Sequence, residues 1–327
     1  MKRQLDGCSN GSKRSTEAVD TTHLYDKPPN WTSNACLGVA KERLIMENVN
    51  PGYFSTDPYF PIKVLNYSLV VYTATLTVLL LYVSLSVTIP FASGEYSFLQ
   101  YLAWYLFFSV LLNWMLILKN SSVFTSNQFV KTSEEGDKYC DICKHWIPPR
   151  GHHCVLCMKC ILRRDHHCYF TGTCIGFRNQ RYFVVFCFDV SVSCGLGWYF
   201  LMLYLDSNFK TFWSEDNYHY LLPLTFVEWL LRWGGIQAFD LFLLTLAWWS
   251  FATFVTALVY FSQQMFVIVR GQTSYEYSRD VHTYRTVLCK HLKSVFGPFW
   301  VINFAFPLFF IQQEGNGISY VANLKEV

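Results

Sequence analysis

Four long apolar runs constrain this chain more than any other feature, because soluble proteins rarely contain uncharged segments of this length. They cover Val64–Ile89, Ser97–Leu118, Tyr182–Leu205 and Leu241–Val269, with Asp189 as the single charge. Each run reaches the roughly 20 residues that a helix needs to cross about 30 Å of hydrocarbon. The composition agrees, since 52% of the 327 residues are hydrophobic and only 15% are charged. We therefore predict an all-α polytopic membrane protein with four transmembrane helices.

Three exceptions to this pattern need predictions of their own. The apolar stretches 220–231 and 298–311 contain prolines and are too short to span a bilayer, so we expect interfacial, re-entrant or packed segments. Asp189 lies inside the third run. Because acids inside a membrane avoid lipid, we expect Asp189 to reach the cytosolic end of its helix or to line a cavity.

The basic residues predict the topology. Segments 1–63, 119–181 and 270–327 contain eight, ten and six Lys and Arg, whereas 90–96 contains none and 206–240 contains two. By the positive-inside rule, both termini and the 119–181 loop are cytosolic. The net charge of +3 is therefore a sign of topology, and we predict no nucleic-acid partner.

These boundaries divide the chain into five regions. Residues 1–63 form a cytosolic N-terminal region, whose first 35 or so residues are expected to be disordered. The other regions are the first two spans (64–118), a cytosolic cysteine-rich zinc domain (119–181), the last two spans with a luminal loop between them (182–269), and a cytosolic C-terminal region (270–327). No cleavable signal peptide is expected, so the first span serves as the signal.

Cysteines and histidines are concentrated in the loop between the second and third spans. Seven of the twelve cysteines lie within residues 140–174, and a cytosolic loop keeps thiols reduced, so metal ligation is favoured over disulfides. The donors occur as Cys140-x-x-Cys143, His152-His153-Cys154-x-x-Cys157-x-x-Cys160, His166-His167-Cys168 and Cys174. Paired CxxC ligands are typical of tetrahedral zinc. The spacing therefore predicts a small domain with two zinc ions.

A count of the donors predicts one spare thiol. Two four-coordinate sites need eight donors, and the loop offers seven Cys and five His, including His145. If each site is Cys₃His, one cysteine remains. The spacing does not identify it, and it leaves open that the loop is only a structural zinc module or a RING-like interaction module. The neighbours favour Cys168, because Asp165 and His166 precede it as in Cys–His nucleophilic catalysis.

The run from Cys140 to Phe183 resembles the DHHC cysteine-rich domain of protein S-acyltransferases (palmitoyltransferases). The matching positions are Pro148–Arg150 (PPR), His153–Cys154, Asp165–Cys168 (DHHC), Cys174, Gly176, Asn179 and Phe183. The resemblance extends beyond the loop, because two predicted spans precede it and two follow. Thr273–Glu276 (TSYE) and Val295–Gly297 (VFG) also resemble C-terminal elements of that family.

The resemblance implies a role for each position. One zinc would be bound by Cys140, Cys143, His153 and Cys160, and the other by Cys154, Cys157, His167 and Cys174. Cys168 would attack the thioester of a fatty acyl-CoA, carry the acyl group and pass it to a cysteine of a protein substrate. His166 would act as the base and Asp165 would orient it. Basic residues of the loop would lie near the CoA head group, such as Arg163, Arg164, Arg178 and Arg181.

The implied function is that of a protein-cysteine S-acyltransferase with two structural zinc ions. Its substrate would be palmitoyl-CoA or another long-chain fatty acyl-CoA. Its other partners would be the lipid bilayer and membrane-associated proteins with cytosolic cysteines. The resemblance favours the Golgi or endoplasmic reticulum membrane over the plasma membrane.

The chain departs from the family pattern at four places, of which Tyr169–Phe170 and His291 make an alternative function plausible. Tyr169–Phe170 stand in place of Pro-Trp, Thr173 and His291 in place of Asn, and Ser274 in place of Thr. The alternative is a catalytically inactive membrane scaffold that binds partners through its zinc domain. We predict an active enzyme, because the nucleophile and acid–base positions are intact. A RING-type ligase is disfavoured, because the contiguous DHHC run does not have the spacing of cross-braced ligands.

Overall fold

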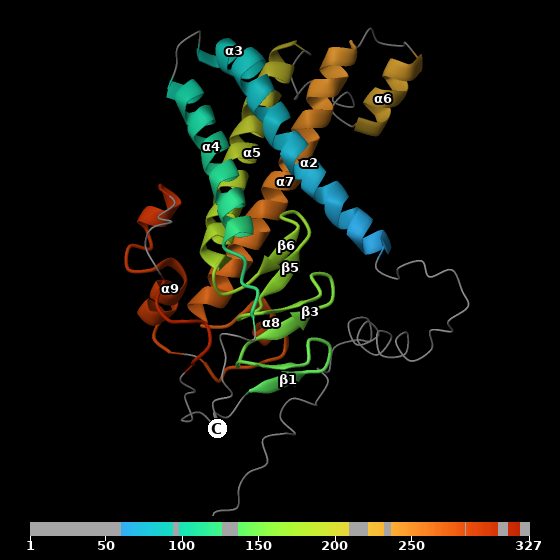
Figure 1. Ribbon diagram of the computed structural model, residues 1–327. Helices are drawn as coiled ribbons and strands as arrows, with labels where there is room; N and C mark the ends of the chain where they lie inside the picture. The colour runs from blue at the N-terminus through green and yellow to red at the C-terminus, as the bar shows by residue number, and fades with distance from the viewer. Residues whose placement is uncertain are drawn as a thin grey trace, which may run out of the picture. The chain divides into compact units, whose positions relative to one another are not determined.

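Four long helices form the membrane part of the fold (Figure 1). The computed structural model describes residues 60–93, 98–125, 137–208, 222–231, 237–284, 286–306 and 313–320. Helix α2 (Phe60–Val83) continues through a π-helical turn, η2 (Ser84–Thr88), into α3 (Ile89–Ser93), and the other three are α4 (Phe98–Lys119), α5 (Gln180–Asn208) and α7 (Ala238–Val269). In this described part, four helical stretches are long and apolar enough to cross a membrane. This result confirms the predicted all-α fold for the four spans, and the structure as a whole is mostly helical, with short strands in the loop between the second and third spans.

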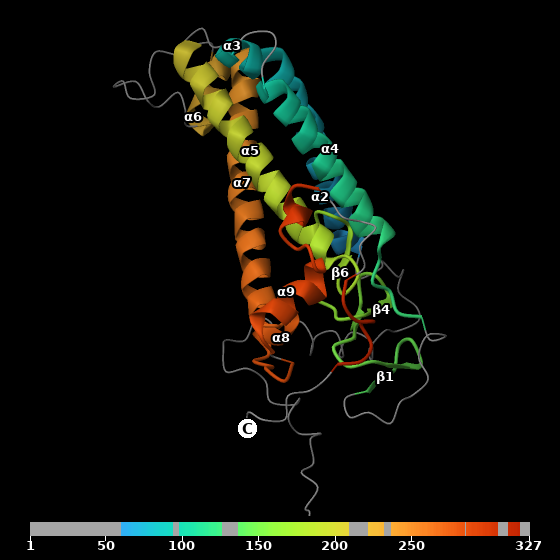
Figure 2. The same cartoon turned by 90° about the vertical axis from the view of Figure 1, so that its left-hand side faces the viewer.

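Helix α5 lies between α4 and α7 and packs along both (Figures 1 and 2). Its glycines explain how closely the neighbours approach. A Cβ on Gly197 would lie 2.6 Å from a methyl carbon of Leu80 on α2, and a Cβ on Gly195 would lie 3.1 Å from the ring of Phe254 on α7. Small residues let membrane helices pack closely. The glycines of α5 therefore set the spacing of the bundle.

Asp189 takes neither of the positions predicted for it. Its side chain is buried on α5 facing α4, where its Oδ2 accepts hydrogen bonds from Ser109 Oγ (2.6 Å) and Asn113 Nδ2 (3.2 Å). It does not contribute to the walls of the cavities described below. Partners on a neighbouring helix satisfy this acid, so it neither reaches the membrane surface nor lines a cavity.

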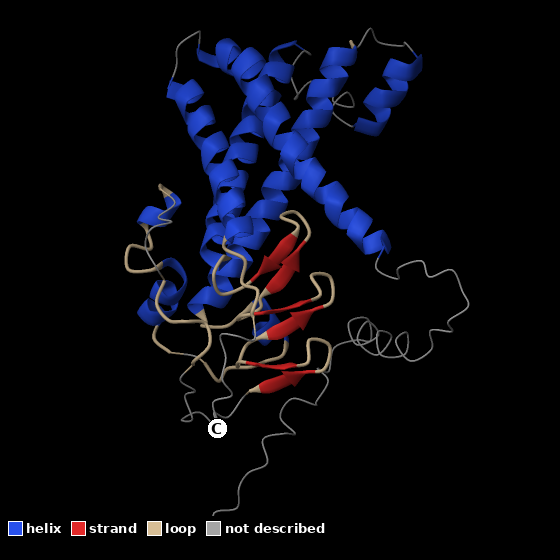
Figure 3. Ribbon diagram, viewed as in Figure 1, coloured by secondary structure: helices blue, strands red, loops and turns tan. Residues whose placement is uncertain are grey.

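The loop between α4 and α5 contains three short β-hairpins in its described part (Figure 3). They are β1 (Lys138–Cys140) with β2 (His145–Ile147), β3 (His152–Cys154) with β4 (Lys159–Ile161), and β5 (His166–Cys168) with β6 (Thr173–Ile175). All three pairs are antiparallel and are joined by four-residue turns. The last residue of each turn has a positive φ: Lys144 (57°), Met158 (52°) and Gly172 (72°). The three hairpins are therefore copies of one local structure.

Within the described residues, neither short apolar stretch forms a helix long enough to span a membrane. Residues Leu222–Leu231 form the ten-residue helix α6. In the second stretch, residues 298–306 contain only a 3₁₀ turn, η5 (Ile302–Phe304), and the ring of Phe304 packs 5.5 Å from Phe188 of α5 and 6.1 Å from Phe261 of α7. The second stretch thus packs against the bundle. The predicted N-terminal tail and most of the luminal loop lie outside the described residues.

Two short helices follow α7. Helix α8 covers Ser274–Ser278 and helix α9 covers Leu288–Phe296. The departure His291 lies on α9 and joins it to the end of α7, since its two ring nitrogens contact the carbonyl oxygen of Val269 (3.0 Å) and the backbone N–H of Thr286 (2.8 Å). Gly271 passes directly against this ring, where a Cβ would lie 2.4 Å from Nε2. His291 therefore fixes the chain that follows the last span.

Candidate active site and metal centres

The hairpins bring eight Cys and His side chains together in two groups of four. One group is Cys140, Cys143, His153 and Cys160, and the other is Cys154, Cys157, His167 and Cys174. Within each group the ligand atoms lie within 4.8 Å of one another. These are the two sets that the resemblance implied, and their role as metal ligands stays a prediction.

The geometry of both groups fits tetrahedral zinc. His153 Nδ1 lies 3.3–3.8 Å from the sulfurs of its group, and His167 Nδ1 lies 3.3–3.8 Å from the sulfurs of the other. Zn–S and Zn–N bonds of about 2.3 and 2.0 Å at tetrahedral angles separate N from S by about 3.5 Å. A Cys₃His set of this size therefore has the chemistry and the dimensions of a structural zinc site.

The repeat of the hairpins explains why one thiol is left over. Each group takes a CxxC pair from one hairpin and a His and a Cys from the next, where His153 pairs with Cys160 and His167 pairs with Cys174 across the strands. Cys168 occupies in the third hairpin the position of Cys154 in the second. The chain then enters α5, so no fourth hairpin supplies partners, and the second position of the pair is Thr171. Cys168 therefore belongs to neither group.

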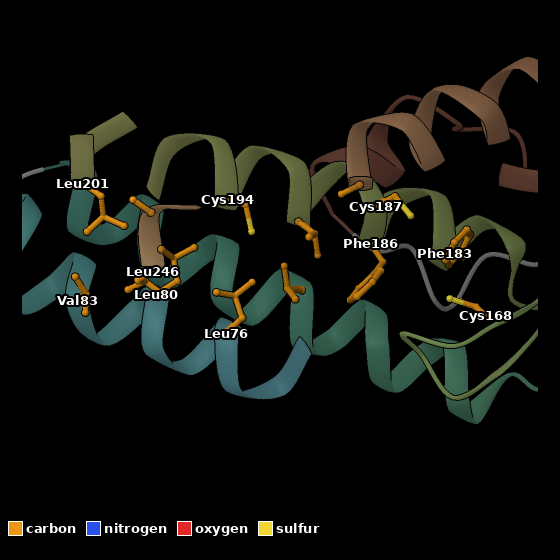
Figure 4. Close-up of a cluster of buried hydrophobic side chains, with 14 of the residues drawn as sticks. Leu76, Leu80, Val83, Cys168, Phe183, Phe186, Cys187, Cys194, Leu201 and Leu246 are labelled. Carbon is orange, nitrogen blue, oxygen red and sulfur yellow. The ribbon is translucent and has the colours of Figure 1, made fainter. Parts of the chain in front are cut away.

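The side chains of strand β5 point to two faces of the hairpin, one toward the second metal group and one toward the membrane helices. Successive side chains of a strand point to opposite faces. His167 therefore points to the metal group, while His166 and Cys168 share the other face. That face lies against the start of α5, where Cys168 belongs to the same buried cluster as Phe183 and Phe186 (Figure 4).

The carboxylate of Asp165 forms four contacts, one with His166 and three with residues of α7 and α8. Its Oδ2 contacts His166 Nδ1 at 2.7 Å and accepts hydrogen bonds from Gln264 Nε2 (2.7 Å) and Ser274 Oγ (2.9 Å). Its Oδ1 accepts one from the backbone N–H of Ser274 at 2.6 Å. Buried carboxylates need such donors to stay charged. Asp165 is therefore a rigid acceptor for the Nδ1 proton of His166.

The electrostatics of these three residues favour a charged pair. Burial would raise the pKa of Asp165, but the bonds from His166 and Ser274 lower it. Burial would lower the pKa of His166, but Asp165 and Cys168 raise it to about 9. Burial would raise the pKa of Cys168, but hydrogen bonding and charge from His166 lower it. Nε2, the ring nitrogen of His166 that does not contact Asp165, is buried.

Comparison with known proteins identifies the family. A family model described as DHHC palmitoyltransferase matches residues 133–281. Palmitoyltransferase ZDHHC22 of Rattus norvegicus is 30% identical over 211 residues, which is 62% of this chain and 74% of that protein. The chain belongs to the DHHC palmitoyltransferase family. Probable palmitoyltransferase ZDHHC24 of Mus musculus is 30% identical over 189 residues, or 57% of this chain and 64% of that protein. The likeness to probable protein S-acyltransferase 7 of Arabidopsis thaliana, 33% identical, covers 33% of this chain and 26% of that protein.

This DHHC palmitoyltransferase family member has an apolar cavity beside Cys168. The cavity measures about 200 Å³ and is lined by residues of α2, β5 and its turn, α5 and α7: Tyr72, Thr73, Cys168, Phe170, Phe183, Phe186, Cys187, Val190, Ala252, Thr253, Thr256, Ala257 and Tyr260. At its far end, the hydroxyls of Tyr72 and Thr253 share a hydrogen bond of 2.7 Å. Beyond this pair, a second apolar cavity continues between α2, α4 and α5 and shares Thr73, Val190 and Thr253 with the first.

The departures Tyr169 and Phe170 take part in this arrangement. The ring of Tyr169 packs edge-on against His167 at 5.3 Å. The ring of Phe170 lines the cavity and packs against Tyr260 at 6.5 Å. Aromatic side chains here therefore cover the metal ligand on one side and close the cavity wall on the other, without the proline of the family pattern.

The basic residues predicted to lie near a CoA head group separate into two sets. Arg163 and Arg181 are buried, with exposed fractions of 4% and 6%, and Arg181 packs over the ring of Tyr182. Arg164 and Arg178 remain partly exposed. The proximity of all four residues to a CoA head group stays a prediction.

Sequence reasoning did not find two residues of this site. Gln264 lies within the fourth span beside a second glutamine, Gln263, and nothing in this apolar run indicates that the amide of Gln264 reaches Asp165. Ser274 was noticed as part of a C-terminal element, but its contact with Asp165 joins positions 109 residues apart. A polar residue buried inside a predicted span is the only signal that could have marked Gln264.

Proposed function

We propose that this protein is a protein-cysteine S-acyltransferase that takes a palmitoyl group from palmitoyl-CoA onto Cys168 and passes it to cysteines of membrane-associated proteins. One observation carries the proposal. Cys168 is the hairpin thiol that belongs to neither metal group, and it lies between a histidine held by Asp165 and an apolar cavity.

The first half-reaction forms a thioester on the protein. His166 takes the proton of Cys168, and the thiolate attacks the carbonyl carbon of palmitoyl-CoA. The bond between that carbon and the CoA sulfur breaks, and the leaving thiolate receives the proton from His166. Asp165 stabilises the imidazolium between these two transfers. The second half-reaction repeats the sequence with a substrate thiol as nucleophile and Cys168 as leaving group.

The cavity supplies the binding energy for the acyl chain. Burying a methylene group is worth about 0.8 kcal/mol. The stretch of α5 that lines the first cavity, from Phe183 to Val190, rises about 10 Å. An extended sixteen-carbon chain is about 18 Å long if each bond advances about 1.2 Å, a third of an extended residue. A palmitoyl chain therefore passes the Tyr72–Thr253 pair and ends in the second cavity.

The zinc ions would have a structural role. Zinc bound to the eight donors would lock the three hairpins together. No step of the acyl transfer needs the metal to touch substrate, because His166 and Asp165 move and hold the proton. The metal instead keeps β5 in the position that presents Cys168 to the cavity.

The direct test is acylation of the purified full-length protein with labelled palmitoyl-CoA, followed by hydroxylamine. We expect a hydroxylamine-labile label on the wild type and none on Cys168→Ser, with two zinc ions per chain retained in both. Cys289→Ser is the matched control, because this exposed thiol lies on α9 outside the cavity and should leave the label unchanged. An unlabelled wild type that keeps two zinc ions would refute the proposal and favour the inactive scaffold. Loss of one zinc in Cys168→Ser would show that the spare thiol is misassigned.

We also propose that both termini and the hairpins face the cytosol, in the Golgi or endoplasmic reticulum membrane. The support is the distribution of Lys and Arg, of which ten lie in the loop that carries the hairpins. Protease protection of sealed microsomes with a tag on each terminus tests the topology, since both tags should be cleaved from outside. Imaging of the tagged full-length chain together with organelle markers tests whether it lies in the Golgi or endoplasmic reticulum membrane.

A further inference from the structure

The two metal groups are alike in their ligands but differ at one atom. In each, the histidine turns Nδ1 toward three sulfurs. Nε2 of His153 is buried and has no hydrogen-bond partner among the described residues. Nε2 of His167 lies 3.3 Å from Oδ1 of Asn66. The second group, which shares its last hairpin with Cys168, is therefore the one whose histidine has a hydrogen-bond partner on the protein.

That partner belongs to the membrane part of the protein. Asn66 lies on α2, the first span, 101 residues before His167. Because Nδ1 faces the sulfurs, it must be unprotonated to bind a metal, and the ring proton is then on Nε2. Nε2–H therefore donates to the amide oxygen of Asn66. A second bond of this kind fixes the tautomer and the ring orientation of a ligating histidine.

The turn of the same hairpin rests on the same part of α2. Gly172 ends the turn with a φ of 72°. A Cβ at Gly172 would lie 3.1 Å from a methyl carbon of Val70 and 3.8 Å from Nδ2 of Asn66. Val70 follows Asn66 by four residues, so both side chains lie on one face of α2. The hairpin thus contacts the helix through its metal ligand and its turn.

We propose that Asn66 is a positioning residue that makes the first membrane helix part of the second metal site. The hydrogen bond from His167 fixes this ligand and, through β5, fixes where Cys168 lies relative to the membrane helices. Among the described residues, the first metal group has no such hydrogen bond behind its histidine. The effect of Asn66 on metal binding is independent of the acyl transfer. The effect of Asn66 on Cys168 rests on the function proposed above.

The expected effect is selective for one metal. Removing the partner of a ligating histidine costs about 10- to 100-fold in metal affinity. Asn66→Leu removes the acceptor oxygen and keeps a side chain of similar size. We therefore expect one zinc per chain to be released more readily and the other to be released as in the wild type. Asn66→Asp keeps an acceptor oxygen and should restore the wild-type behaviour of both.

The experiment follows zinc transfer from the purified full-length protein to a coloured chelator, 4-(2-pyridylazo)resorcinol. Ser68→Ala is the matched control, because Ser68 is exposed on α2 two residues away and bonds only to the carbonyl of Val64 within the described part of the chain. Three results would each overturn the proposal: release from Asn66→Leu that equals the wild type, equal acceleration of both zinc ions, or an Asn66→Asp variant that behaves like Asn66→Leu.

A second measurement separates positioning from folding. With zinc supplied in excess, Asn66→Leu should still show a lower maximal rate of Cys168 acylation, by about 10-fold for a displacement near 1 Å, since misplacement of that size costs up to about 100-fold. The KM for palmitoyl-CoA should stay near the wild-type value, because the cavity is unchanged. If the wild type is not acylated at all, the zinc-release result still decides the role of Asn66. An unchanged maximal rate in the zinc-loaded variant would refute the effect on Cys168.

Discussion

Replacing Glu276 with glutamine should strongly destabilise the contact between the hairpins and helix α8. The side chains of Arg150 and Glu276 are buried, with exposed fractions of 5% and 6%, and form two parallel bonds of 2.6 Å. Arg150 also donates to the carbonyl of Gly271 (3.1 Å), and the carboxylate accepts from the backbone N–H of Thr273 (2.9 Å), which closes the capping box of α8. Glu276→Gln keeps an acceptor for the cap but leaves the guanidinium unpaired.

The magnitude follows from this burial. Breaking a buried ion pair by neutralising one partner costs about 3–5 kcal/mol, because the remaining charge stays out of water. Replacing both charges at once costs much less, since no unpaired charge remains. The double variant Arg150→Leu with Glu276→Gln should therefore be more stable than Glu276→Gln alone, although it carries one more substitution.

The assay is thermal unfolding of the purified proteins in one detergent, with acylation of Cys168 measured alongside. We expect midpoints in the order wild type, double variant, Glu276→Gln. Acylation should fall in the same order, because α8 carries Ser274, which holds Asp165. If Glu276→Gln unfolded at the wild-type midpoint, or if the double variant were the least stable, the claim that an uncompensated buried charge dominates would be refuted.

Three further predictions concern the metal, the buried acid and the cavity. Cys154→Ser should lose one zinc and unfold at a lower temperature, as metal analysis and a melting curve would show, because zinc binding is coupled to folding. Asp189→Ala should lower the free energy of unfolding by about 1 kcal/mol, since its two donors on α4 lose their acceptor, and Asp189→Asn should recover most of this in the same melting assay. Thr253→Val removes the bond to Tyr72 that must break when a chain reaches the second cavity, so it should favour palmitoyl-CoA over shorter acyl-CoA by about fivefold, since a hydrogen bond is worth about 1 kcal/mol; equal chain-length profiles in a competition assay would contradict this.

The membrane spans could be predicted from the sequence because length and lack of charge are local properties. The helices begin and end within four residues of the predicted runs, as for α5, which starts at Gln180 rather than at Tyr182. The spacing within one short loop predicted two zinc sites, whereas the division of the eight donors into two groups came from the family resemblance. The hairpin strands were not predicted, since three-residue strands leave no periodic pattern to detect.

The contacts that complete the site join distant positions and could not be predicted. Gln264 and Ser274 reach Asp165 across 99 and 109 residues, and Asn66 reaches His167 across 101. The sequence around each of these polar residues does not indicate its distant partner. Their partners are determined only when four helices pack and the hairpins dock on them, which is a property of the whole fold. The same reason explains the error for Asp189, whose donors lie on a different span.

The hairpin repeat suggests why this protein combines metal sites with a reactive thiol in one short domain. The thiol of Cys154 lies in a group of four donors because the following hairpin offers a histidine and a cysteine. The same position in the last hairpin faces the start of α5 and an apolar cavity instead, so its thiol lies outside both donor groups. The two donor groups join all three hairpins, and the third hairpin also carries a thiol outside both groups whose place is set by its neighbours. On this reasoning Tyr169 and Phe170 need not abolish activity, because the metal groups and the contacts of Asp165, not the proline, determine where Cys168 lies.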